Sequence, residues 1–180
     1  MEDIKKQVVM LSLMESMKDS GSWCGETHIQ KSVYFLQTML DVPTGFDFIL
    51  YKHGPFSFEL RDSLGEMRGN LLIELTSRFP YGPSYHPTAS GKALIERYPK
   101  TAAAYQKQIE YIARYFAGLG VAELERLATA LYVTEEEGHV SPEERAKKIN
   151  EIKPHIPIDM AEAAIHEVEK IAHEFRLIAS

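Results

Sequence analysis

One stretch in the middle of the chain constrains the fold more than any other. Residues 71–77 have the composition of a strand, Pro80-Tyr81-Gly82-Pro83 that of a turn, and residues 84–87 that of a short return strand. Thr88 can then cap a helix that runs through Ile95. A hairpin followed by a helix is the order in which a winged-helix unit places its wing.

The segments before this hairpin fit the same order. Ser57 can cap a helix on which Leu60, Leu64 and Met67 share one face. The predicted fold class is therefore mainly α with a small β component, with a winged-helix-like N-terminal part and a C-terminal helical layer.

Two more helices are predicted at the start of the chain. Residues 3–18 place apolar side chains at helical spacing. The second helix is predicted to begin at Thr27, because Gln30 follows at the spacing of a capping box. Its buried stripe is predicted to consist of Ile29, Val33, Leu36 and Leu40, widened by Tyr34 and Phe35.

A short aromatic segment links this helix to the one that Ser57 caps. Residues 46–51 are aromatic and branched, which favours a strand. His53-Gly54-Pro55 favours a turn, because proline fixes φ and glycine tolerates a positive φ.

The second half of the chain predicts helices only. Ser141-Pro142-Glu143-Glu144 is a capping box with proline at the first helical position. We expect a winged-helix-like domain over residues 1–98 and a helical extension over residues 99–180 packed on it, with one compact unit as the alternative. The helical side chains expected to be buried are Tyr105, Ile112, Phe116, Ile165, Val168 and Phe175.

Composition limits the partners. The net charge is −6, and neither residues 1–98 nor residues 99–180 have an excess of basic side chains, which argues against nucleic-acid binding. The sequence contains no apolar run near the roughly 20 residues of a membrane span. The N-terminus is not that of a secretory signal, and Cys24 has no second cysteine to pair with, so a cytoplasmic location is expected.

No strong catalytic motif is present, so the sequence predicts no enzyme, no catalytic residue and no cofactor. Cys24 is interpreted as a small apolar residue, and its pairing with His28 as a reactive thiolate is the weaker alternative. His166, Glu169 and His173 share a helix face at a spacing that a metal could use. A solvated face explains them better, so no metal site is predicted.

Two segments, residues 30–34 and 51–57, concentrate aromatic, basic and turn-forming residues. In one interpretation the aromatic rings close the core and Gly54-Pro55 only turns the chain. In the other the segments bind a partner, with Lys31 pointing away from the buried stripe and Phe56 as an apolar anchor. The residues on which this binding would depend are Lys31, Tyr34, Lys52, His53, Gly54, Pro55, Phe56 and Ser57.

These motifs, in this order, resemble the Panacea domain, the family of SocA-like antitoxins and phage-associated proteins, and especially its YwgA-like branch. The resemblance covers about residues 5–135. Ile29 replaces the usual leucine before Gln-Lys, and Phe56 replaces the commoner tyrosine or valine after Gly-Pro. The matching segments are residues 29–37, 51–57, 85–91 and 124–129.

The resemblance implies a non-enzymatic protein-binding module, an antitoxin or adaptor of a toxin–antitoxin system whose partner is often encoded nearby. A winged-helix transcription regulator is the alternative. In that case residues 57–68 would enter the major groove, but Glu59, Asp62 and Glu66 outnumber the two arginines there. A basic protein partner therefore fits better than DNA. Homo-oligomers are left open.

Overall fold

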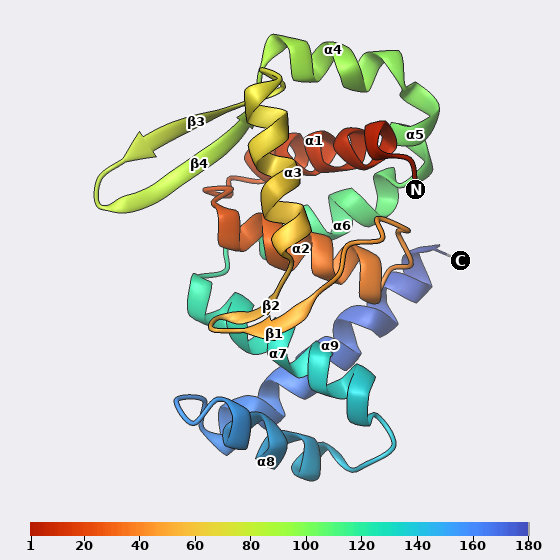
Figure 1. The fold of residues 1–180 in the computed structure, drawn as a ribbon. Helices are drawn as coiled ribbons and strands as arrows, with labels where there is room; N and C mark the ends of the chain where they lie inside the picture. Colours follow the sequence, from red (N-terminus) through yellow and green to blue (C-terminus); the bar gives the residue numbers. More distant parts are fainter. Residues whose placement is uncertain (180) are drawn as a thin grey trace. The chain divides into compact units, whose positions relative to one another are not determined.

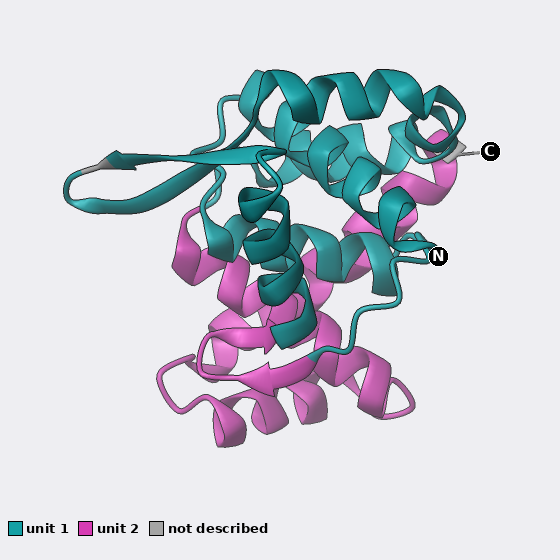
Figure 2. Ribbon diagram, turned by 45° about the horizontal axis from the view of Figure 1, so that its top comes forward, with its two compact units in different colours: residues 1–48, 57–119 teal, residues 49–56, 120–180 magenta. Residues whose placement is uncertain are grey.

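The computed structural model describes residues 1–179 and is mainly helical with a small antiparallel β component, as predicted (Figure 1). Its internal contacts divide it into two compact units (Figure 2). Unit 1 comprises residues 1–48 and 57–119, and unit 2 comprises residues 49–56 and 120–180. The division into folding domains at residue 98 stays a prediction. Within the described residues, no helix is long and apolar enough to cross a membrane.

Unit 1 is built from helices and one long hairpin. Its elements are α1 (Asp3–Asp19), α2 (Glu26–Thr38), α3 (Phe58–Gly69), β3 (Ile73–Arg78), β4 (Tyr81–Pro87), α4 (Ala89–Arg97), α5 (Pro99–Ala104) and α6 (Gln106–Phe116).

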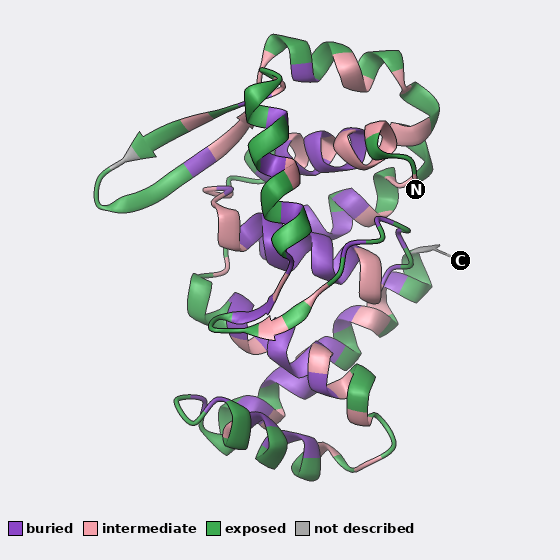
Figure 3. Ribbon diagram, in the orientation of Figure 1, coloured by how far each residue is buried: buried purple, intermediate pink, exposed green. Residues whose placement is uncertain are grey.

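Helix α2 forms the centre of the core of unit 1. Every residue from His28 to Leu36 is buried, which confirms the predicted apolar stripe (Figure 3). The ring of Phe35 meets that of Phe116 edge-on, with centroids 4.8 Å apart. The predicted capping box at Thr27 is wrong. The helix begins one residue earlier, with Gly25 as the N-cap and no side-chain cap.

Strands β3 and β4 form the predicted hairpin, which extends away from the helices of unit 1 (Figure 1). Its predicted turn over residues 80–83 is wrong in extent, because Arg78 pairs with Tyr81 and β4 already begins at Tyr81. Its tip is exposed, with Phe79 97% accessible. At its base the Thr88 hydroxyl donates to the Leu71 carbonyl and accepts from Gly91 N–H, so the predicted cap of α4 is confirmed. Gly91 is required there, because a Cβ at this position would clash with the Leu72 carbonyl oxygen.

Unit 2 combines a short hairpin with three helices. Ser141 and Glu144 form the predicted capping box at the start of α8. Of the six helical side chains expected to be buried, five are, while Tyr105 in unit 1 is half-buried. The elements of unit 2 are β1 (Ile49–Tyr51), β2 (Gly54–Phe56), α7 (Val121–Glu137), α8 (Pro142–Ile152) and α9 (Ile158–Ala179).

The short hairpin corrects two predictions. The strand predicted over residues 46–51 covers only Ile49–Tyr51. Of the residues predicted as a turn, His53 does lie in the turn, whereas Gly54 and Pro55 begin the second strand. Tyr51 pairs with Gly54, so Lys52 and His53 make the two-residue connection. Pro55 is tolerated in β2 because a two-stranded sheet has only edge strands.

Candidate functional site

The predicted partner-binding residues fall into both units. Lys31, Tyr34 and Ser57 belong to unit 1, and residues 52–56 belong to unit 2. Each group is therefore described within its own unit.

In unit 1, Lys31 and Tyr34 are buried with the rest of α2. The expectation that Lys31 points to solvent is wrong, because its exposed fraction is 2%. The physical reason is that α2 is covered on all its faces along this run, whereas the prediction assumed one exposed face. Tyr34 packs its ring against Phe48, with centroids 5.1 Å apart, which favours the interpretation of this ring as core.

Ser57 is buried and held by Gln30. The Gln30 side-chain amide donates from Nε2 to the Ser57 carbonyl, and its Oε1 accepts from Ser57 N–H, both at 2.9 Å. The Ser57 hydroxyl in turn accepts from Leu60 N–H, which confirms the predicted cap of α3. Gln30 therefore fixes the start of α3. The sequence had instead assigned Gln30 to a capping box with Thr27, so this role was missed.

In unit 2, one face of the short hairpin carries three apolar side chains, Ile49, Tyr51 and Phe56, which we call the hairpin face. Ile49 pairs with Phe56 across the strands, and the rings of Tyr51 and Phe56 lie 5.8 Å apart. Ile49 is 48% exposed and Tyr51 52% exposed, whereas Phe56 is half-buried. Phe56, expected to be an apolar anchor, is thus less exposed than its two neighbours on this face.

The two residues that connect the strands are exposed, whereas the first two residues of β2 are buried. Lys52 and His53 are exposed, as predicted. Gly54 and Pro55 are buried, and Gly54 has a φ of +81°, a conformation that other residues rarely adopt.

The buried ammonium group of Lys153 binds the backbone of this connection. Lys153, directly after α8, donates from Nζ to the Tyr51 carbonyl at 2.7 Å and to the Lys52 carbonyl. Its charge is balanced by Glu125 of α7, whose carboxylate lies 3.6 Å from Nζ. Both side chains are at least nine-tenths buried. The ion pair thus holds the backbone of the hairpin in one position.

Two histidines border the same carboxylate. His155 Nε2 lies 3.2 Å and His53 Nδ1 3.6 Å from the Glu125 oxygens, and both imidazoles are more than half exposed. Glu125, Lys153 and His155 were missed in the sequence. Nothing local to Lys153 indicates a partner about 100 positions earlier, so only the fold could reveal the contact.

The thiol of Cys24 has no features of a nucleophile. Burial raises its pKa to about 12, so it is protonated at neutral pH. His28 is not a base for it either, because its Nε2 lies 3.0 Å from the Leu119 carbonyl oxygen. Burial also lowers the pKa of His28.

The histidines of α9 do not form a preorganised metal site. Glu169 binds Arg145 instead, with Oε1 2.8 Å from Nη2, and His166 Nδ1 lies 3.7 Å from the other oxygen. Among residues 1–179, no three His, Cys, Asp or Glu side chains converge as metal ligands.

No protein-family model matches the chain, and no curated protein is similar to it in sequence.

Proposed function

We propose that the protein is a non-enzymatic protein-binding module of the antitoxin or adaptor type, and that it contacts its partner through the hairpin face. The observation that carries this proposal is that Ile49 and Tyr51 are about half exposed on a hairpin whose backbone is fixed by the buried Lys153.

This combination favours binding for two physical reasons. A backbone that is already fixed loses little conformational entropy when a partner docks. Aromatic side chains supply a large share of the binding energy at interfaces. Tyr51 is followed by the polar Lys52 and His53, which matches the usual arrangement of an apolar centre with a polar rim.

The charge of the chain favours a protein as the partner. The net charge is −6, so phosphates would be repelled over much of the surface, whereas a basic protein would be attracted. The resemblance to SocA-like antitoxins adds that this partner is a toxin or a protein to be delivered.

Affinity capture with matched variants tests the proposal. Tagged wild-type protein and its Tyr51→Ala variant are compared for capture of partners from a lysate of the host. The control is Tyr81→Ala at the tip of the other hairpin, where the ring is 65% exposed. We expect Tyr51→Ala to weaken capture of one protein by about tenfold or more, and Tyr81→Ala to leave it unchanged.

Melting curves separate binding from folding in this experiment. If Tyr51→Ala lowers the melting temperature, Ile49→Ser provides the second test of the same face. Equal capture by wild type and by a folded hairpin-face variant would place the binding surface elsewhere and contradict the proposal.

A winged-helix transcription regulator is the second candidate, because α3 is followed directly by the β3–β4 hairpin. Against it, the exposed residues of α3 include Glu59, Asp62 and Glu66. We expect no nanomolar binding to DNA from upstream of the gene at physiological salt. Such binding with a steep salt dependence would favour the regulator instead.

A further inference from the structure

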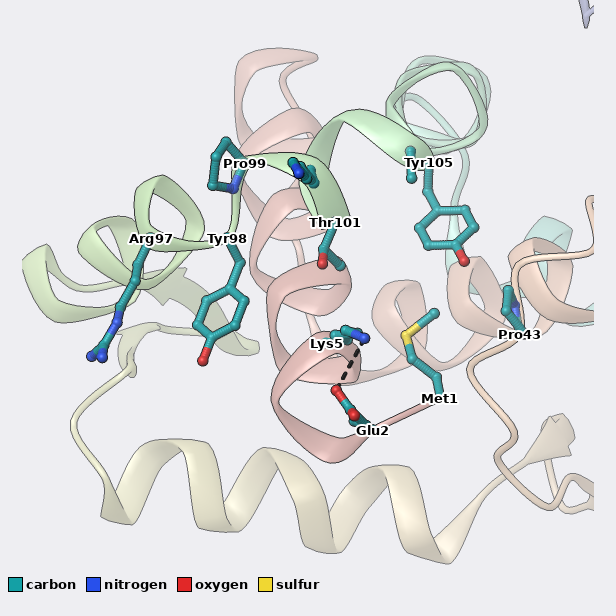
Figure 4. A pocket seen from close by; sticks show the side chains of 11 residues that line it. Met1, Glu2, Lys5, Pro43, Arg97, Tyr98, Pro99, Thr101 and Tyr105 are labelled. Carbon is teal, nitrogen blue, oxygen red and sulfur yellow. Dashed lines mark ion pairs between the residues drawn. The ribbon is translucent and has the colours of Figure 1, made fainter.

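We draw no further inference here: the strongest candidate, the hollow of about 840 Å³ between the start of α1 and the α4–α5 corner of unit 1 (Figure 4), carries nothing because it is open at the surface and its cations Arg97 and Lys100 are exposed side chains that the structure does not bring together around one ligand.

Discussion

The two hairpins of the molecule are held in opposite ways. The long hairpin, with strands of six and seven residues, is held by its own pairing. Neighbouring backbone adds to it, as Tyr85 N–H donates to the Cys24 carbonyl and Gly25 bridges to Ser84. The short hairpin has strands of three residues and is held by the side chain of Lys153.

This difference follows from the lengths of the strands. Two three-residue strands make too few ladder hydrogen bonds to be stable alone, so their conformation must be fixed from outside. A longer ladder can project from its unit with an exposed tip. The short hairpin should therefore depend on one buried charge, and the long one on packing at its base.

The largest effect is expected at Lys153. Lys153→Met leaves Glu125 as a buried carboxylate without its ammonium partner and removes the donor to the Tyr51 and Lys52 carbonyls. We expect the free energy of unfolding to fall by about 3–5 kcal/mol, measured by urea denaturation.

Two further variants test the cause of that loss. Lys170→Met removes an exposed lysine paired with Glu167 and should cost less than about 0.5 kcal/mol. Replacing both buried partners, as Lys153→Met with Glu125→Leu, should recover part of the loss, because no unpaired charge remains. A single Lys153→Met variant as stable as wild type would contradict the comparison.

An intermediate effect is expected at the base of the long hairpin. Gly91→Ala would push a methyl group against the Leu72 carbonyl, whose backbone cannot move without disturbing the start of β3. We expect a loss of about 1–3 kcal/mol in thermal or urea unfolding.

The control for this change is another helical glycine. Gly65 in α3 has open space where a Cβ would stand, so Gly65→Ala should be neutral or raise stability by up to about 1 kcal/mol. If both variants behave alike, close packing at the hairpin base is not what requires glycine at position 91.

The two hairpins also differ in how well the sequence predicts them. The long one is encoded locally, by the branched residues of its first strand, a proline-containing turn and Thr88, and its existence was predicted correctly, although Tyr81, Gly82 and Pro83 of the predicted turn lie in β4. In the short one the sequence predicted the turn at His53-Gly54-Pro55, but only His53 lies in it, and Gly54 and Pro55 belong to β2. Lys153 binds the backbone carbonyls at this turn, and no local pattern of the sequence connects Lys153 to it.

The same limit applies to the candidate site. Helical periodicity placed Ile29 and Val33 in the core correctly, but it assumed that Lys31, two positions away, would be exposed. Periodicity identifies the apolar face of a helix, but it does not show whether the polar face is also covered by other elements. Exposure was predicted correctly for Lys52 and His53, where the chain reverses direction at the surface.

A smaller effect on stability is expected when the pH is lowered, because the long hairpin contains a histidine. The pKa of His86 in β4 is lowered by burial and by the nearby charge of Lys18. The unfolded chain therefore binds a proton near its ordinary pKa of about 6.5 while the folded chain does not. Stability should be constant above that pH and should fall as the pH is lowered through it, until the folded-state pKa is passed.

The structure gives a reason for this sign. His86 Nε2 is 2.7 Å from the Ser84 hydroxyl, and Nδ1 is buried with no hydrogen-bond partner among the described residues. In the charged imidazolium both ring nitrogens carry a proton, and the proton on Nδ1 would have no acceptor among the described residues. Urea midpoints at pH 7.5, 6.5 and 5.5 should show a shallower decline for His86→Gln than for wild type. Burial of His28 acts in the same direction, so some decline should remain in the variant.

The smallest effect on stability is expected at Lys52, although its backbone contacts Lys153, where the largest effect is expected. Lys153 binds the carbonyl oxygen of Lys52, and the Lys52 side chain itself is exposed. Lys52→Ala keeps the carbonyl, so the free energy of unfolding should change by no more than about 0.5 kcal/mol. The same denaturation series measures both variants. A loss at Lys52→Ala approaching that of Lys153→Met would mean that the side chain, and not the backbone, holds the short hairpin, and the contrast between the two hairpins would then fail.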